Sequence, residues 1–434
     1  MDGASIGTET TASKAADPVR KLLVLDTNYS LEAIRERQIE QSVTCRDLDG
    51  FFAHVWSVHP FATLVTSDRW GPRYGKPETY ELAPRHTIIE AKVGRFGRLR
   101  WAFPLNFLLS QVDLFARLRG LIRREEISVI RAASPLYVGL FGWLLARSTG
   151  IPLVVRVGGN HDKFFETTGR PIEPRLMRSR KVEKRVERFV FSRADLVAGA
   201  NQDNLDFALA NGARPERSTL FRYGNLVDRR HFVLPAERES DDAFLNQLGV
   251  EPGKFLLYVG RLEPIKQADH VIEVLAAVRR RGLDVKAVLA GDGTMRADLE
   301  ERARRLGIAD HVVFAGNVGQ VGLAQLYPAS AAIVSPHTGR ALTEAALSEA
   351  PVAAYDVDWQ SELIETGVTG ILVPHGDVTA LADATAQLLA EPQTARRVGA
   401  NLRRRALDVL DPRALDEHER SEYRKLLGAA ARGA

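Results

Sequence analysis

The sequence predicts an α/β protein built of two doubly wound domains, each with a parallel sheet covered by helices. Three observations carry this prediction. The chain has 434 residues, enough for two or three domains that each bury a core. Its hydrophobic fraction of 45% and charged fraction of 26% are those of an ordinary globular protein. Short apolar runs alternate with segments of helical spacing, which is typical of parallel sheets.

The first series of elements begins with the apolar run KLLVLDT over 21–27. This run predicts a strand, and the helical spacing from residue 30 predicts the helix that follows it. ISVIRAA from residue 127 and IPLVVRVGG from residue 151 predict two more strands, with an apolar helix from residue 136 between them. Such repeats leave little room for hairpins, so we expect a parallel sheet.

A polar stretch without periodicity, LVDRRHFVLPAERESDD, separates the first series from a second one that begins at Lys254. We predict a mobile tail over residues 1–20, a first Rossmann-like domain over 21–232 and a second over 233–411. Ligands of such sheets bind beyond the carboxyl ends of the strands. We therefore expect the two domains to face a shared cleft.

Charge and cysteine content exclude several classes of function. The 59 Lys and Arg residues against 55 Asp and Glu residues give a formal charge of +4, which does not predict nucleic-acid binding. Cys45 is the only cysteine, so no intramolecular disulfide can form, and this suits a reducing cytoplasm. The polar residues 1–20 predict neither a signal peptide nor an anchor, and no apolar run of about 18 residues predicts a membrane span.

Two cations follow the first strand of the second domain. In YVGRLEPIKQADHVIEVL, Arg261 comes just after the strand and Lys266 lies near the start of the next helix. Together with helix amides they could meet a diphosphate, and two solvated charges beside a turn are the alternative. LAGDGTMRADLEE has glycines at 291 and 293 but no third glycine of a dinucleotide fingerprint, which favours a simple strand-to-helix turn.

The segment HTGRALTEAAL predicts an anion site at the start of a helix. Thr338 is a candidate N-cap, Gly339 lets a ligand approach, and the amides of Arg340 and Ala341 face that ligand. Glu344 lies about one turn to a turn and a half inside the helix, within reach of a ribose diol. An exposed helix glutamate is the alternative.

Five segments of the second half occur in the order and close to the spacing of one known family: YVGRLEPIK, LAGDGTMRADLE, VVFAGNV, LTEAALSEAPVAAYD and ELIETGVTGILVPHGD. This half resembles the donor-binding domain of glycosyltransferase family 4 (glycosyl transferases group 1), retaining enzymes of the GT-B fold. YGNLVDRRHF is similar to the end of the family's first domain, which implies an acceptor domain over 21–232. The resemblance also implies that a final helix over about 412–430 crosses back to that domain.

The resemblance assigns roles to individual residues. Arg261 and Lys266 are expected to stabilise the donor diphosphate during catalysis. Glu344 matches the last glutamate of the family's E-x7-E motif and is expected to bind the ribose. Gly316 and Asn317 are expected to flank the base.

The first glutamate of that motif is absent. Eight positions before Glu344 the sequence has Pro336, and His337 follows in place of the common glycine. In the family the first glutamate contacts the transferred sugar, so this departure bears on which sugar is held. His337 is a candidate replacement contact, and a structural loop histidine is the alternative.

One further histidine is a candidate catalytic residue. His161 follows a strand of the first domain within VVRVGGNHDKFF and is expected to face the cleft, where it could orient hydroxyls of either substrate. A histidine that merely caps a loop is the alternative. YDVDW over 355–359 superficially resembles an Asp-x-Asp metal site, but there is no histidine cluster and the diphosphate already has two cations. We expect no metal and no cofactor.

An apolar, aromatic-containing helical stretch over 98–124 has arginines at both ends. It is a candidate for binding an anionic membrane surface, and the alternative is that Leu108, Leu109, Val112, Phe115 and Leu118 face the core. The basic run over 175–189 is more typical of a solvated face. We therefore predict a cytoplasmic protein, with peripheral attachment to the inner face of the membrane as a candidate.

The sequence predicts a retaining glycosyltransferase that moves a sugar from a nucleotide-diphosphate sugar to an acceptor hydroxyl. The acceptor is expected to be a glycan, a lipid-linked molecule or a small molecule, in polysaccharide, glycolipid or other glycoconjugate synthesis. Two alternatives stay open. One is a GT-B sugar-nucleotide epimerase, and the other is a nucleotide-sugar-binding scaffold that lost catalysis with its first glutamate.

Overall fold

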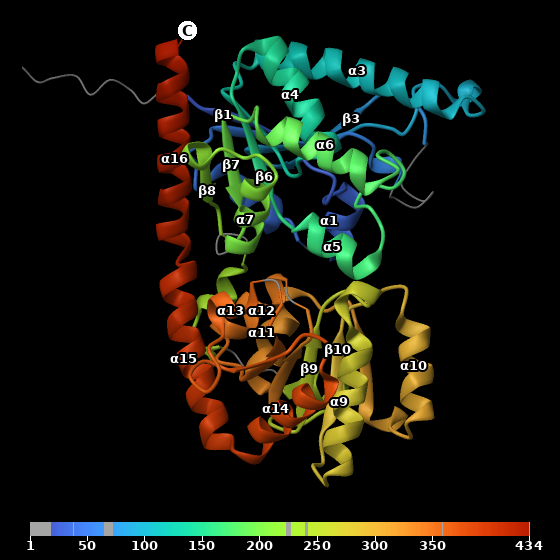
Figure 1. Ribbon diagram of the computed structural model, residues 1–434, viewed down its shortest axis with the longest axis vertical. Coiled ribbons are helices and arrows are strands. Elements are labelled where there is room, and N and C mark those ends of the chain that lie inside the picture. The colour runs from blue at the N-terminus through green and yellow to red at the C-terminus, as the bar shows by residue number, and fades with distance from the viewer. Residues whose placement is uncertain are drawn as a thin grey trace, which may run out of the picture.

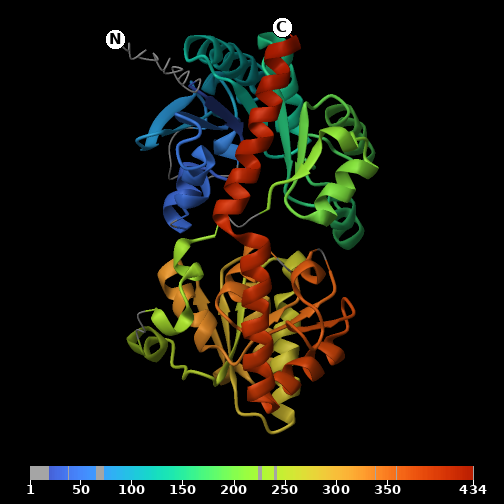
Figure 2. The same cartoon turned by 90° about the vertical axis from the view of Figure 1, so that its left-hand side faces the viewer.

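The computed structural model describes residues 19–37, 39–64, 73–222, 227–238, 242–337, 339–357 and 359–433. Figures 1 and 2 show two α/β domains joined end to end, with the C-terminal helices, drawn in red, running along one side of both. The predicted tail over 1–20 lies outside the described residues except for its last two. The predicted fold class, two doubly wound domains, is confirmed.

Eight strands form the first sheet, in the order β3-β4-β2-β1-β5-β6-β7-β8. Their bounds are β1 Lys21–Leu25, β2 His54–His59, β3 Glu78–Ala83, β4 His86–Glu90, β5 Val129–Ala132, β6 Leu153–Val157, β7 Leu196–Gly199 and β8 Ser218–Leu220. All neighbours are parallel except β3 and β4, which form an antiparallel pair. This edge pair corrects the expectation of a sheet without hairpins. β3 is half exposed, so it lacks the continuous apolar run of a buried strand.

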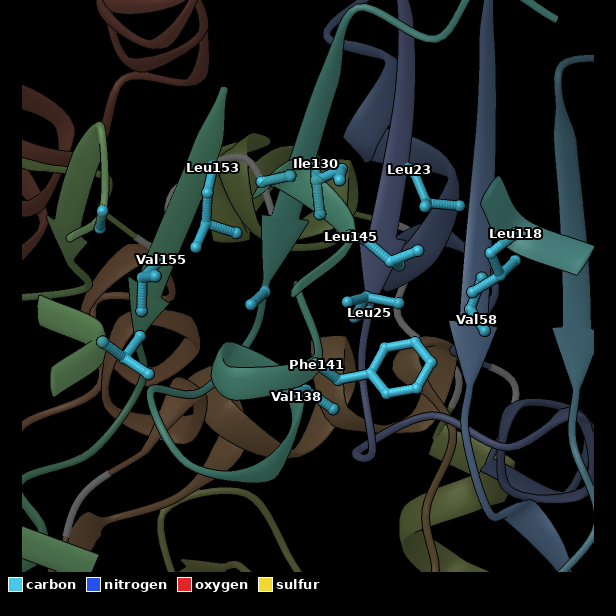
Figure 3. Close-up of a cluster of buried hydrophobic side chains, with 14 of the residues drawn as sticks. Leu23, Leu25, Val58, Leu118, Ile130, Val138, Phe141, Leu145, Leu153 and Val155 are labelled. Carbon is cyan, nitrogen blue, oxygen red and sulfur yellow. The ribbon is translucent and has the colours of Figure 1, made fainter. Parts of the chain in front are cut away.

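Helices on both faces cover this sheet. They are α1 Leu31–Arg37, α2 Gln41–Thr44, α3 Phe103–Arg124, α4 Tyr137–Thr149, α5 His161–Thr168, α6 Arg180–Phe191 and α7 Gln202–Ala210. Figure 3 shows the core on one face, where Phe141 and Leu145 of α4 point at Leu25 of β1. Buried apolar side chains of this kind each contribute about 1.5–3 kcal/mol.

The second sheet has six parallel strands in the order β11-β10-β9-β12-β13-β14. Their bounds are β9 Phe255–Val259, β10 Lys286–Ala290, β11 Val312–Gly316, β12 Ala332–Ser335, β13 Val352–Tyr355 and β14 Ile371–Val373. The strand order reverses between β9 and β12. In such sheets the ligand crevice opens at this reversal, beyond the carboxyl ends of the strands.

The helices of the second domain are α8 Asp242–Gln247, α9 Ala268–Arg280, α10 Arg296–Arg305, α11 Gln320–Ala329, α12 Arg340–Leu347, α13 Gln360–Leu363, α14 Val378–Ala390 and α15 Pro392–Leu410. The connecting segment from the first domain packs on this domain as well. His231 lies against Gln320 of α11, and the Arg238 guanidinium donates to the carbonyl of Ala324.

The last helix, α16 Pro412–Gly433, returns to the first domain (Figure 2). Its Tyr423 is fully buried and packs edge-on against Phe52, with ring centroids 5.0 Å apart. Glu419 pairs with Arg131 of β5 at 3.0 Å, and both side chains are buried. The C-terminus of the chain therefore closes the first domain's core.

Candidate active site

The two sheets direct the carboxyl ends of their strands toward each other. Between them lies a cavity of about 440 Å³. Its first-domain wall includes residues that follow β1, β5 and β6, around the point where the strand order of that sheet reverses. Its second-domain wall contributes Arg261 and Arg340. A cavity at two such reversals is where substrates of doubly wound domains are expected.

The loop that carries Arg261 is fixed by close backbone packing. The Tyr258 hydroxyl donates to the carbonyl of Arg261 at 3.1 Å. A Cβ on Gly291 would lie 1.9 Å from the carbonyl oxygen of Gly260, and one on Gly293 would lie 2.4 Å from that of Leu262. The two glycines are therefore needed because the backbone of Gly260 and Leu262 packs against them, which agrees with the interpretation of this segment as a structural turn.

The Lys266 ammonium lies beside the loop that leads into α12. The Lys266 Nζ lies 3.2 Å from His337 Nδ1, and a Cβ on Gly339 would lie 3.8 Å from the same ammonium. Because an ammonium group has only donors, His337 Nδ1 accepts and the ring proton resides on Nε2. Thr338, the predicted N-cap, lies outside the described residues.

Glu344 is buried rather than exposed, with 4% of its surface accessible. The Tyr327 hydroxyl donates to its Oε2 at 3.0 Å, and Gln320 Nε2 donates to its Oε1 at 3.3 Å. Burial raises the pKa of Tyr327, which keeps the phenol protonated as a donor. The carboxylate still has lone pairs for a further hydroxyl, since each oxygen has two.

The partners of Glu344 were not foreseen from the sequence. Gln320 and Tyr327 are seven residues apart on α11, which places them on one face of that helix. His231 extends this hydrogen-bond network, because its Nε2 lies 2.8 Å from the Gln320 Oε1. Burial lowers the pKa of His231, so the neutral ring donates from Nε2. The seven-residue spacing of Gln320 and Tyr327 was the one sign in the sequence that both face Glu344, and this spacing belongs to no motif.

Arg340 links the two domains. Its guanidinium donates to the Oγ of Ser42 on α2, so the first turn of α12 is tied to the first domain. Ala341 follows on α12 and lines a small pocket with His337. The structure thus gathers Lys266 and His337 around the start of α12, whose first residue, Arg340, lines the cavity.

Gly316, the last residue of β11, and Asn317 after it lie at the same carboxyl edge. The carbonyl of Gly316 accepts from the amide of Gly291 at 2.7 Å, and Gly316 has a left-handed φ of +65°. Asn317 is exposed. Two strands, β10 and β9, separate this loop from β12, so the predicted base-flanking loop is at the far end of the site from α12.

His161 begins α5 and is held by an ionic network. Its Nδ1 lies 2.7 Å from Glu187 Oε1, and Glu187 also accepts from the buried Arg180. Only 7% of the His161 surface is accessible, and it is absent from the described lining of the 440 Å³ cavity. Its predicted contact with substrate hydroxyls stays a prediction.

Three arginines in the first-domain wall were missed by the sequence analysis. They are Arg46, next to α2, Arg131 within β5 and Arg156 within β6. The signal for two of them was present, because a charged residue interrupts the apolar strands VIRA and LVVRV just before their carboxyl ends.

The Asp-x-Asp segment contributes no recorded metal site. Asp356 is exposed after β13, and Asp358 lies outside the described residues. Within the residues that the structure describes, no group of three or more His, Cys, Asp or Glu side chains could hold a metal ion. In the same residues, none of the helices combines the length and hydrophobicity needed to cross a membrane.

Comparison with known proteins gives two family matches. The model of the glycosyl transferase 4-like domain matches residues 29–224, and that of the glycosyl transferases group 1 matches residues 241–405. The chain is similar to alpha-D-kanosaminyltransferase of Streptomyces kanamyceticus, at 28% identity over 289 residues, which cover 60% of this chain and 67% of the relative. It is also similar to a D-inositol 3-phosphate glycosyltransferase of Nocardia farcinica, at 32% over 212 residues, 45% of this chain and 47% of the relative.

Among solved structures, HepE of Anabaena in complex with UDP and glucose is similar in fold. It covers 94% of this chain and all of its own at 19% identity, with a TM-score of 0.69. The two family matches fall on the two domains described above and together span the cleft between them. The chain belongs to the glycosyltransferases of the GT-B fold in which a glycosyl transferase 4-like domain precedes a group 1 domain.

Proposed function

We propose that the protein is a retaining glycosyltransferase that moves a sugar from a nucleotide-diphosphate sugar to a hydroxyl of a glycan, a lipid-linked acceptor or a small molecule. The observation that carries this proposal is the proximity of the Lys266 ammonium to the start of α12, beside the cavity that Arg261 and Arg340 line. Cations and helix amides at one point suit a diphosphate, which is the leaving group of such a donor.

In this mechanism the protein stabilises the charge that develops as the diphosphate leaves. Arg261, Lys266 and the amides at the start of α12 contribute that stabilisation, while Glu344 accepts from the ribose. Ser42 and Arg340 hold the two walls together, which helps to exclude water. Pro336 stands at the position of the family's first glutamate, and the neighbouring His337 contacts the transferred sugar in its place. The mechanism uses no enzyme nucleophile and no metal.

A panel of nucleotide sugars tests the proposal. Thermal shifts with UDP, GDP and ADP sugars identify the donor, because a ligand that binds only the folded state raises Tm. The radiolabelled donor is then incubated with membrane extract, with and without a chelator. We expect transfer that the chelator leaves unchanged, and a product whose anomeric configuration, measured by NMR, is that of the donor.

Other outcomes of the panel would support the alternatives. Binding without transfer or hydrolysis would identify a nucleotide-sugar-binding scaffold. Conversion of the donor to another nucleotide sugar with no acceptor present would identify an epimerase. An inverted anomeric configuration in the product would reject retention while leaving transfer in place.

A surface on the first domain favours peripheral attachment to an anionic bilayer. The helix α3 and the segment before it expose six large apolar side chains, and Trp101 has 81% of its surface accessible. These side chains, which we call the α3 patch, are Phe96, Trp101, Phe103, Leu105, Leu108 and Val112. The opposite face of α3 buries Leu114, Leu118 and Ile122 in the core, so Leu118 faces inward while Leu108 and Val112 do not.

The charge around the α3 patch suits anionic lipid. Arg98 and Arg100 beside it are exposed, as are four arginines further along α3: Arg117, Arg119, Arg123 and Arg124. From residue 96 to 124 the single acidic residue is Asp113, which pairs with Arg95 and Arg117. Apolar side chains flanked by arginines are the composition of interfacial helices.

Vesicle sedimentation tests this attachment. We expect the protein to bind vesicles of phosphatidylcholine with phosphatidylglycerol and not vesicles of phosphatidylcholine alone. Leu108→Asp should abolish sedimentation. Val321→Asp, at a similarly exposed residue of the second domain, is the matched control and should sediment like the wild type. Equal sedimentation of the two variants would reject the α3 patch as the membrane contact.

A further inference from the structure

The cavity between the domains is lined by an excess of arginines. Five guanidinium groups line it, with one carboxylate, Asp26, among the described lining residues. Arg261 and Arg340 belong to the second domain, and Arg46, Arg131 and Arg156 belong to the first. The proposed donor diphosphate uses the second-domain wall. The arginines of the first-domain wall are not explained by it.

Two of the first-domain arginines already have a buried counter-charge. Arg46 donates to Asp26 and to the Oγ of Ser57, the latter at 2.8 Å, and it is 5% accessible. Arg131 pairs with Glu419 at 3.0 Å and is 4% accessible. Such pairs are fixed in place, because a buried charge without its partner costs several kcal/mol. They form a rigid floor at the carboxyl ends of β1 and β5.

Arg156 is the third first-domain arginine that lines the cavity. It lies in β6 just before Gly158, is half-buried, and its Nη2 donates to the carbonyl of Phe221 at 2.9 Å. A guanidinium has five N–H donors in a fixed fork, which suits two oxygens of a phosphate or a carboxylate. The cavity volume of about 440 Å³ is within the range of small-molecule pockets.

We propose that the acceptor carries a negatively charged group, a phosphate monoester or a carboxylate, which Arg156 binds in the first-domain wall beside Arg46 and Arg131. This inference rests on the proposed function, since it names the class of the second substrate of that site. Anchoring one end of the acceptor there orients its hydroxyl toward the donor sugar across the cavity. Removing a charge-assisted contact to such a group weakens binding by about tenfold or more.

Titration of inorganic phosphate tests the anion site directly. Full-length protein is saturated with whichever of UDP, GDP or ADP raises its Tm, so that the donor diphosphate position is filled, and phosphate is then titrated calorimetrically. We expect phosphate to bind alongside the nucleotide. Arg156→Gln should weaken phosphate at least tenfold with nucleotide affinity unchanged, and Arg156→Lys should weaken it less because the charge remains.

Arg147→Gln, at an exposed arginine of α4, is the matched control and should bind phosphate like the wild type. The inference is overturned if phosphate only competes with the nucleotide, or if Arg156→Gln and Arg147→Gln bind it equally. If none of the three nucleotides binds, the proposed function fails and the acceptor assignment fails with it, and the phosphate titration without nucleotide then reports only whether Arg156 binds an anion.

Paired acceptors then distinguish the two anionic groups. Each set contains a neutral sugar or cyclitol, its phosphate monoester and its uronic acid. We expect transfer to one anionic member, with a KM that Arg156→Gln raises at least tenfold while the donor KM stays constant. Transfer to the neutral member with equal kcat/KM would overturn the inference and leave the glycosyltransferase intact.

Discussion

The two walls of the cleft are built in different ways. The second-domain wall comes from short stretches of one domain, 258–266 and 335–344, in which neighbouring residues supply the loop, the cation and the helix start. The first-domain wall gathers arginines from the short 3-10 helix Cys45–Asp47, from β5 and from β6, and Arg131 is paired with Glu419, which lies 288 residues further along the chain.

This difference separates what a motif can encode from what only a fold can. A motif fixes residues that a strand end and the next helix bring together, so its chemistry is visible locally. The first-domain wall depends on which strands become neighbours and on a helix that returns from the C-terminus. The first two predictions below each perturb one wall and leave the other as the reference.

The largest expected effect comes from breaking the ion pair that joins α16 to the first-domain wall. Glu419→Ala leaves the Arg131 guanidinium buried without its carboxylate, and we expect the free energy of unfolding to fall by about 3–5 kcal/mol. Urea unfolding followed by circular dichroism measures this. Glu417→Ala, on the exposed side of the same helix, should leave the urea midpoint unchanged. Similar midpoints for the two variants would show that α16 is not held by this pair.

Substitutions in the second-domain wall should reduce catalysis and leave stability unchanged. Lys266→Ala removes a cation from the proposed leaving-group site, and we expect kcat/KM for transfer to fall about 100- to 1,000-fold with the unfolding transition retained. Lys254→Ala, at the opposite end of β9, is the matched control and should transfer at the wild-type rate. Glu344→Ala should also lose transfer while remaining folded. A soluble Lys266→Ala protein with wild-type kcat/KM would remove Lys266 from the site.

Most of the fold could be predicted from the sequence, because buried parallel strands read as apolar runs. KLLVL, ISVIRAA and KFLLYVG contain strands that the structure has at those positions. The antiparallel edge pair β3 and β4 could not be found that way. Its outer strand, ETYELA, alternates exposed and half-buried residues, and such a pattern is too short and polar to stand out from a loop.

The site could be predicted from the sequence only where its residues belong to one short segment. Lys266 lies beside His337 and Gly339, although the sequence had placed Lys266 at the start of one helix and His337 and Gly339 at the start of another. The burial of Glu344 by Tyr327 and Gln320 was not visible, since it requires α11 to pack on α12. The arginine wall was not predicted either. A single arginine in an apolar strand signals an unusual position without saying which others join it.

A smaller effect tests the buried charges of the first domain. Burial raises the pKa of Glu173 from its ordinary value of 4.5 to about 7, while its Oε2 accepts from the amide of Tyr137 at 3.2 Å. The protonated carboxyl therefore contributes stability that is fully present below about pH 4.5 and is lost as the pH rises through about 7. Glu173→Gln keeps the acceptor and cannot ionise. Relative to wild type it should gain about 2–3 kcal/mol between pH 4.5 and pH 8 in urea unfolding, and a constant difference would reject the shift.

The smallest effect concerns the loop expected to flank the base. Gly316 and Gly307 have nearly the same left-handed φ, +65° and +68°, and a Cβ on either would meet nothing within 4 Å. Alanine at each should therefore cost about 1 kcal/mol of stability, from backbone strain alone. Gly316 lies at the carboxyl end of β11 and Gly307 precedes the amino end of the same strand. If the donor base lies against Gly316, Gly316→Ala should raise the donor KM several-fold while Gly307→Ala leaves it unchanged. Equal donor KM values would place the base elsewhere, although both variants would still report the same strain.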